Sequence, residues 1–223
     1  MDPSTTFGRS PSFRLPLIRC LSRPVTRCLA ATGVTPNQVT LLGTAAGLAA
    51  ALCYLRDGMA WALAGAVLFS LSYLLDNCDG ELARIKGLQS RLGASLDDLG
   101  DWAVHAALFL ALGVRTAQET GQTVWLWLAV AAALGATINS VLMWAKGSDG
   151  EAEVSQLREL PATATWLDRL SFLLRGLIKA DFWLLLLILT LSDLLWLLLP
   201  AAALGSHVFW LLYLRKTARS FHT

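Results

Sequence analysis

Long stretches without a charged residue constrain this chain more than any other feature of its sequence. Residues 39–55, 59–75 and 182–191 contain no Asp, Glu, Lys or Arg. A helix needs about 17–25 mainly apolar residues to cross a bilayer, and a soluble core does not need so many in succession. The 223 residues are 55% hydrophobic and 15% charged, against about 25% charged in soluble domains. The sequence therefore predicts an all-α integral membrane protein.

Six apolar segments are candidate transmembrane helices. They are residues 38–55, 59–82, 93–114, 122–145, 177–191 and 194–214. The fifth segment is short, and Ser192 and Asp193 are the polar break that must form a tight turn before the sixth. Once loops and spans are subtracted, the length leaves room for one membrane domain over residues 1–223.

The placement of basic residues favours six spans with both termini in the cytoplasm. In this orientation only Arg56 and Arg115, of the 18 lysines and arginines, lie outside. Such a bias is what the positive-inside rule describes, and an odd number of spans would destroy it. The net charge of +2 gives no indication of a nucleic-acid partner.

The N-terminal residues are expected to lie at the membrane surface. Residues 1–14 are polar and are expected to be a loose tail, and residues 15–32 to be an amphipathic interfacial helix. Arg19, Arg23 and Arg27 recur every four residues and so share one face, although Pro24 can bend the helix. A basic face suits anionic headgroups. The alternative is the solvated face of a soluble helix.

Two pairs of aspartates occur where ionisable groups are costly and are therefore functional by default. Asp76 and Asp79 share a face of the second span, and Asp97 and Asp101 share a face of the third. Only a short connection around residues 86–91 separates these spans. They are expected to form an antiparallel hairpin with both pairs at its cytoplasmic end. The four carboxylates can then converge on one point.

Such a cluster predicts a divalent cation. Four carboxylates in one small volume cannot all stay ionised without one, and hard oxygen ligands suit Mg²⁺, Mn²⁺ or Ca²⁺ rather than zinc. We expect Mg²⁺ or Mn²⁺, with two ions at the attacking and leaving oxygens of a displacement at phosphorus. Gly80, Ala83 and Gly93 leave space for a nucleotide on the same faces, although small residues also serve close helix packing. Arg84 is placed to neutralise a diphosphate.

Eight of these residues stand at fixed spacing over residues 76–101, which is far more specific than a lone pair of aspartates. They are Asp76, Asp79, Gly80, Ala83, Arg84, Gly93, Asp97 and Asp101. The pattern resembles the signature of the CDP-alcohol phosphotransferase (CDP-alcohol phosphatidyltransferase) family, with every fixed position filled. Residues 35–40 also resemble the entry of that family into its first span. The resemblance covers nearly the whole chain.

The resemblance implies a six-helix membrane enzyme, often a homodimer, with a polar cavity open to the cytoplasm. It implies transfer of a phospho-alcohol group, here expected to be phosphatidyl, from a CDP-alcohol to an acceptor hydroxyl with release of CMP. The donor class includes CDP-diacylglycerol. The expected setting is phospholipid or related polar-lipid synthesis in a bacterial inner membrane. The sequence of residues 79–86 is most similar to that of family members that act on inositol-phosphate-type substrates.

The same resemblance assigns roles to individual residues. The metal ligands are expected to be Asp76, Asp79, Asp97 and Asp101, and Asp101 is also the expected catalytic base. Contacts with CDP are expected from Asn37, Thr40, Asp76, Gly80, Ala83 and Arg84. Asp98, Glu81 and Asn77 occupy variable positions and receive no role.

Two further residues are candidates for contacting the acceptor. His105 lies one turn after Asp101, so it can touch the acceptor or orient that aspartate, or be a structural histidine. Lys179 opens the fifth span and can hold an acceptor phosphate, or snorkel to the interface. Residues 147–168 form either a lid over the cavity or a plain cytoplasmic loop.

Two other functions fit parts of the sequence. A magnesium-dependent membrane prenyltransferase needs a second aspartate-rich motif, but the later spans carry only the isolated Asp181 and Asp193. An ion or proton transporter needs carboxylates distributed through the bilayer, whereas here they cluster at one hairpin. Both alternatives are therefore less well supported than phospho-alcohol transfer.

Overall fold

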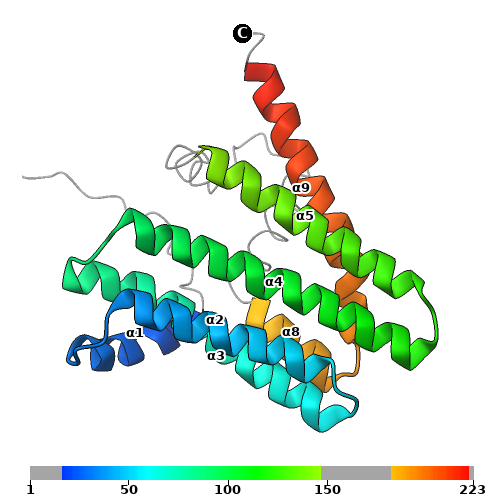
Figure 1. The fold of residues 1–223 in the computed structure, drawn as a ribbon, viewed down its shortest axis with the longest axis horizontal. Helices are drawn as coiled ribbons and strands as arrows, with labels where there is room; N and C mark the ends of the chain where they lie inside the picture. Colours follow the sequence, from blue (N-terminus) through cyan, green and yellow to red (C-terminus); the bar gives the residue numbers. More distant parts are fainter. Residues whose placement is uncertain (1–16, 147–181, 221–223) are drawn as a thin grey trace, which may run out of the picture.

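The computed structural model describes residues 17–146 and 182–220, and within them the chain is helical with no strand (Figure 1). The helices are α1 (Leu17–Ala30), α2 (Pro36–Tyr54), α3 (Met59–Lys86), α4 (Arg91–Thr120), α5 (Val124–Lys146), α8 (Phe182–Leu191) and α9 (Leu198–Ser220), with a short 3-10 helix η1 (Leu195–Leu197). The predicted all-α class is confirmed.

Each apolar segment falls on a helix where the structure describes it. The helices α3 and α4 run beyond the predicted spans 59–82 and 93–114 at their polar ends, because a helix can continue where the sequence is no longer apolar. The expected tight turn at Ser192 and Asp193 is present, and Asp193 has a left-handed φ of 56°. Residues 1–14, 147–168 and 177–181, with their expected tail, loop and span start, lie outside the described residues.

Local signals in the sequence set the helix ends near the aspartates. Thr35 and Gln38 form a capping box at the start of α2, in which each side chain accepts a backbone N–H of the other residue. Gly87 ends α3 with a φ of 64°, a conformation that suits glycine. The Ser90 hydroxyl accepts the Gly93 N–H and caps α4. The link between α3 and α4 is therefore only a few residues long.

The arrangement of α2, α3 and α4 differs from a simple packed hairpin. The helix α2 packs along both α3 and α4, whereas α3 and α4 make few close backbone contacts with each other (Figure 1). Around these three helices, α1 and α8 pack on α3, α5 packs on α4, and α9 packs on α5. The two aspartate pairs thus face each other with α2 alongside both.

Small residues allow α2 to approach its two neighbours closely. A Cβ added at Gly47 would lie 2.5 Å from Val104 Cγ2 on α4 and 2.7 Å from Ser72 Oγ on α3. A Cβ added at Gly100 on α4 would overlap the Thr44 hydroxyl on α2. Any larger side chain at these crossings would force the helices apart.

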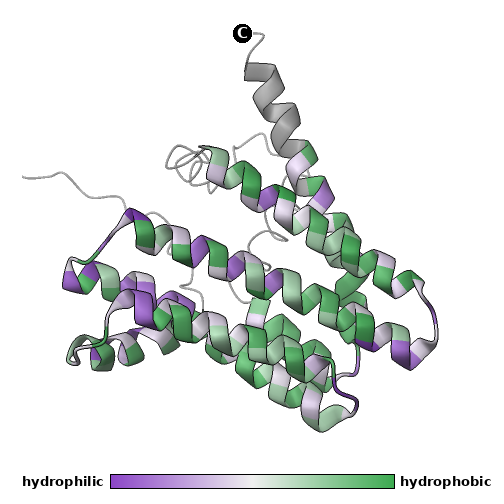
Figure 2. Ribbon diagram, in the orientation of Figure 1, coloured by the Kyte–Doolittle hydropathy of each residue, from purple (hydrophilic) through white to green (hydrophobic). Residues whose placement is uncertain are grey.

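The outer surface is rich in large apolar side chains. Leu42, Leu52 and Trp127 are 61%, 65% and 72% exposed. Among the described residues two helices, Met59–Lys86 and Val124–Ala145, are long and apolar enough to cross a membrane by length and composition, and Phe182–Leu191 and Leu195–Val208 are shorter apolar helices. Hydrophilic residues gather instead at α1 and at the adjoining ends of α3 and α4 (Figure 2). This distribution suits a bilayer with a polar region at one end of the bundle.

Replacing Gly113 with leucine is expected to destabilise the α4–α5 packing. A Cβ at Gly113 would overlap that of Ala129 and lie 3.0 Å from the Trp125 carbonyl oxygen, so overpacking should cost about 1–3 kcal/mol. The measurement is the thermal unfolding midpoint in detergent. Gly205→Leu is the matched control, since a Cβ there meets nothing within 4 Å. Equal midpoints for the two variants would contradict the described crossing.

Candidate active site

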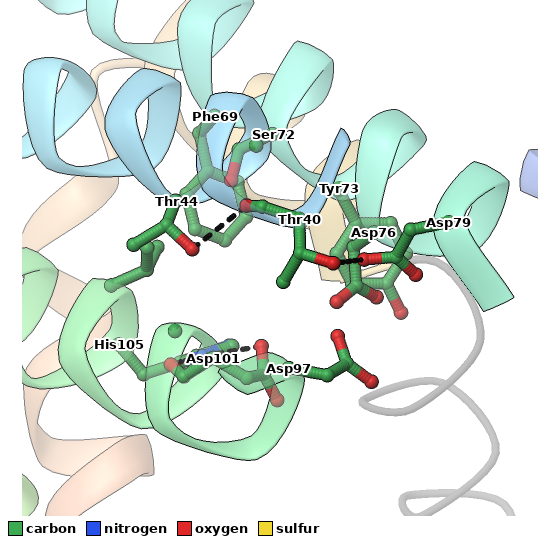
Figure 3. A pocket seen from close by; sticks show the side chains of 13 residues that line it. Thr40, Thr44, Phe69, Ser72, Tyr73, Asp76, Asp79, Asp97, Asp101 and His105 are labelled. Atoms are coloured by element: carbon green, nitrogen blue, oxygen red, sulfur yellow. Dashed lines mark hydrogen bonds and ion pairs between the residues drawn. The ribbon is translucent and has the colours of Figure 1, made fainter. Parts of the chain in front are cut away.

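A polar pocket opens between α2, α3 and α4, at the end of the bundle where the hydrophilic residues gather. The space between its walls is about 370 Å³, part of it open to solvent. Figure 3 shows the side chains of α2 and α3 on one side of the pocket and those of α4 on the other. The lining residues are Thr40, Gly43, Thr44, Phe69, Ser72, Tyr73, Asp76, Asp79, Asp97, Gly100, Asp101, Val104 and His105.

Asp79 is the most buried of the four aspartates and is held from α2. Its residue is 4% exposed, and its Oδ2 accepts the Thr40 hydroxyl at 2.5 Å (Figure 3). Thr40 Oγ1 also lies 3.2 Å from the Pro36 carbonyl oxygen, in the first turn of α2. This hydrogen bond fixes the Asp79 carboxylate relative to α2.

The other three aspartates complete the acidic lining of the pocket. Asp76 lies one turn before Asp79 on α3, within electrostatic range of Asp79, Asp97 and Asp101. Asp97 and Asp101 lie on the facing side of α4, and the Asp101 side chain is 59% exposed. The structure thus brings together all four aspartates that the sequence singled out. They converge across the pocket because α2 holds α3 and α4 in register.

The chemistry of this lining fits a hard divalent cation. Asp97 Oδ1 is buried and has no hydrogen-bond partner among the described residues, so it is an acceptor that a cation could satisfy. The surrounding atoms that could bind a metal are carboxylate and hydroxyl oxygens, the ligands that Mg²⁺ and Mn²⁺ prefer. Within residues 17–146 and 182–220, however, no three His, Cys, Asp or Glu side chains stand together as a closed ligand set. The carboxylates line two walls rather than enclosing one point.

Of the six residues expected to contact CDP, Thr40 and Asp76 line this pocket, and the other four are not among its lining residues. Asn37, in the first turn of α2, faces α4: a Cβ at Gly93 would lie 3.0 Å from its Oδ1. The guanidinium of Arg84 folds back over Gly80, with Nη1 3.5 Å from the position of a Cβ there. Arg84 is exposed and also within electrostatic range of Asp79. Ala83 is half-buried on the same helix. A Cβ at Gly93 would therefore crowd the Asn37 side chain, whereas one at Gly80 would make only ordinary contact with Arg84.

The two candidate acceptor contacts have different outcomes. His105 Nδ1 lies 2.8 Å from the Asp101 carbonyl oxygen and 3.2 Å from Asp101 Oδ1. The imidazole ring packs among aromatic rings, 6.0 Å from Phe69 and 5.7 Å from Phe182 between centroids. This geometry suits orientation of Asp101, and because His105 also lines the pocket, contact with the acceptor stays a prediction. Lys179 lies outside the described residues.

The inner part of the pocket was missed by the sequence reasoning. Thr44, Phe69, Ser72 and Tyr73 line it beyond the aspartates. Ser72 and Tyr73 precede Asp76 by four and three residues, so helical periodicity places them on its face. Polar side chains at that spacing inside an apolar span could have identified Ser72 and Tyr73 as lining residues of the pocket.

Known proteins match this chain in sequence and in fold. The family model described as CDP-alcohol phosphatidyltransferase matches residues 33–213. A phosphatidylinositol phosphate synthase of Mycolicibacterium smegmatis is 46% identical over 92 residues, which are 40% of each chain. A bifunctional IPC transferase and DIPP synthase of Thermococcus kodakarensis is 36% identical over 132 residues, 57% of this chain and 29% of that protein. The aligned regions thus cover less than half the length of each of these two relatives.

Solved structures of the Mycobacterium tuberculosis phosphatidylinositol phosphate synthase share the fold. The structure with CDP-DAG bound is 29% identical, with a TM-score of 0.53, and the match covers 85% of this chain and 90% of that one. The structure of the same protein in complex with manganese and citrate has the same identity and TM-score and covers 84% and 85%. The likeness therefore extends over most of both chains.

Loss of the Thr40 hydroxyl is expected to weaken metal binding. In Thr40→Val the Asp79 carboxylate loses its hydrogen bond from α2, and groups that orient ligands typically contribute about 10- to 100-fold to metal affinity. The measurement is the dissociation constant for Mn²⁺, followed by electron paramagnetic resonance. Thr44→Val is the control, because the Thr44 hydroxyl donates to the Thr40 carbonyl oxygen and not to a carboxylate. Unchanged Mn²⁺ affinity in Thr40→Val would show that Asp79 does not need this contact.

Proposed function

Because this chain belongs to the CDP-alcohol phosphatidyltransferase family, we propose that it transfers a phospho-alcohol group from a CDP-alcohol to an acceptor hydroxyl and releases CMP. The observation that carries the proposal is the pocket in which the four aspartates of the signature face one another beside Thr40. Family membership supplies the reaction class, and the pocket supplies side chains suited to it.

For the substrates we favour CDP-diacylglycerol as donor and an inositol phosphate as acceptor. The Mycolicibacterium relative is named a phosphatidylinositol phosphate synthase, and the Mycobacterium tuberculosis protein of that name has been crystallised with CDP-DAG. The Thermococcus relative bears a different name, bifunctional IPC transferase and DIPP synthase, and we keep as a second candidate a CDP-linked polar alcohol with a lipid acceptor. An apolar outer surface suits at least one lipid substrate.

The residues of the pocket can perform the transfer as follows. Asp76, Asp79, Asp97 and Asp101 would hold Mg²⁺ or Mn²⁺, in our proposal two ions, whose charge would neutralise the diphosphate. Asp101 accepts the proton of the acceptor hydroxyl. The acceptor oxygen then forms a bond to the phosphorus distal to cytidine, and the bond from that phosphorus to the CMP oxygen breaks.

Neighbouring side chains position these groups. His105 contacts Asp101 Oδ1 at 3.2 Å and directs that carboxylate, while Thr40 directs Asp79. Arg84 and Asn37 would contact the diphosphate and the nucleotide, with Gly80 and Ala83 leaving space for them. Lys179 remains a candidate for binding an acceptor phosphate.

We place this pocket at the cytoplasmic surface of a six-span protein with both termini in the cytoplasm. The bias of lysine and arginine supports this orientation. The same proposal treats residues 1–223 as one domain, with α1 at the interface of a bacterial inner membrane and the chain acting as a homodimer, as family members often do.

The reaction is tested by acceptor-dependent CMP release from purified protein with Mn²⁺ and CDP-diacylglycerol. Asp97→Asn and Asp101→Asn are each expected to lower the rate at least about 100-fold, since the first removes a proposed metal ligand and the second a positioned base, which is worth about 10²–10⁴. Asp98→Asn is the matched control, because Asp98 is exposed and does not line the pocket. It should keep activity close to that of the unmodified protein.

The choice of acceptor and donor decides between the candidates. Inositol phosphate should support CMP release, whereas glycerol phosphate and serine should not. CMP formed only from CDP-linked polar alcohols would favour the second substrate pair. Release of pyrophosphate from a prenyl diphosphate, with no CMP from any CDP-alcohol, would indicate a prenyltransferase and contradict the proposal.

The proposed topology predicts opposite exposure of two loops. With the four native cysteines replaced, Gln89→Cys between α3 and α4 should react with a membrane-impermeant maleimide only in inverted vesicles. Gln122→Cys between α4 and α5 should react only from the outside of intact spheroplasts. Both side chains are exposed, so both should react in detergent. Labelling of both from the same side would exclude the six-span arrangement.

A further inference from the structure

The helix α1 docks on α3 directly behind the catalytic motif. Glu81 of α3 accepts a hydroxyl at each carboxylate oxygen: Ser22 Oγ lies 3.2 Å from Oε1, and Thr26 Oγ1 lies 3.1 Å from Oε2. Ser22 and Thr26 are 0% and 1% exposed. They are one turn apart, so one face of α1 presents both hydroxyls to a single carboxylate.

This polar contact lies inside an otherwise apolar interface. Around it, Val25 and Leu29 of α1 pack against Cys78 and Leu82 of α3. Neither ion pair found in the described residues includes Glu81. Glu81 is half-buried, and the partial loss of water from a carboxylate is costly unless its acceptor sites are satisfied; the two hydroxyls satisfy one site on each oxygen. Apolar side chains could have held α1 without this cost, so the contact favours one specific docking geometry.

The position of Glu81 relative to the aspartates gives the contact its significance. Glu81 follows Asp79 by two residues, which places the two side chains on nearly opposite faces of α3. At this one turn, α3 is therefore hydrogen-bonded to α2 through Thr40 on the pocket side and to α1 through Glu81 on the far side. The two contacts together fix the rotation of α3 about its axis.

We infer that Glu81 is a positioning residue, which through Ser22 and Thr26 holds α1 against α3 and keeps Asp76 and Asp79 directed into the pocket. Among the described helices, α1 packs chiefly on α3, so loss of this contact loosens α1 and weakens its hold on the rotation of α3. Apolar packing and the Lys86 hydrogen bonds to the Thr32 and Val34 carbonyl oxygens still hold α1. The inference deepens the proposed function and rests on it for the role of the two aspartates.

Cys78 provides a built-in reporter of α1 docking. It is 0% exposed, and its Sγ lies 3.6 Å from the Ser22 carbonyl oxygen, beneath α1. In a variant in which Cys20, Cys28 and Cys53 are replaced by serine, Cys78 is the remaining thiol. Its rate of reaction with a small maleimide then measures how often α1 leaves α3.

The experiment compares the full-length single-cysteine protein with Glu81→Ala, with Glu81→Gln and with a Ser22→Ala, Thr26→Val double variant. Glu81→Ala and the double variant should label at Cys78 at least about 10-fold faster. They should also bind Mn²⁺ about 3- to 10-fold more weakly by electron paramagnetic resonance, at the low end of effects of groups behind a metal site. Glu81→Gln should restore both values, because an amide can accept one hydroxyl and donate to the other.

Glu119→Ala is the matched control. Glu119 pairs with Arg115 at 2.7 Å near the other end of α4, so its loss removes a structural carboxylate away from the pocket. It should change neither Cys78 labelling nor Mn²⁺ affinity. Thermal unfolding in detergent identifies any variant that has lost its fold, and the Ser22, Thr26 double variant then carries the test in place of Glu81→Ala.

The possible outcomes separate this inference from the proposed function. Faster labelling with unchanged Mn²⁺ affinity would show that Glu81 anchors α1 but does not position the aspartates, and would overturn the inference. Unchanged labelling would overturn it as well. Absence of CMP release from the unmodified protein would contradict the proposed function alone, since labelling and Mn²⁺ binding require no turnover.

Discussion

The close crossing of α2 with both α3 and α4 is the constraint on which the pocket depends. At Gly47 and Gly100 there is no room for a Cβ, so the backbones approach until the facing walls of the pocket can act on one ligand. The Thr40 hydroxyl then reaches Asp79. In a membrane, where apolar contact between helices gains little over contact with lipid, such close packing is a main source of association.

The apolar helices could be predicted from the sequence because their determinant is local. Charge-free stretches mark the spans, and the helix ends follow from residues such as Thr35, Gly87 and Ser90. The packing of α2 against both α3 and α4 could not be predicted in this way. The short link between α3 and α4 suggests that these two helices pack directly on each other. In the structure each packs on α2 instead, because small side chains on the three helices meet at the crossings. Such meetings between distant residues depend on the whole fold.

Much of the candidate site could be predicted for a similar reason. The spacing of Asp76 to Asp79 and of Asp97 to Asp101 fixes each pair on one helical face, and the short link between the two helices places both pairs at the same end of the bundle. The contacts between helices remained hidden. The expected contact of Thr40 with the nucleotide stays a prediction, whereas its hydrogen bond to Asp79 was not foreseen. Glu81 received no role, because its partners Ser22 and Thr26 lie more than fifty residues earlier in the chain.

The separation of α3 from α4 has a consequence for how the protein matures. The second wall of the pocket becomes available only when α4 has packed along α2, since α3 offers it little direct contact. A nascent chain that has inserted only through α3 therefore carries Asp76 and Asp79 but no opposing carboxylates. The concentration of negative charge that calls for a divalent cation therefore arises only once α4 has packed along α2.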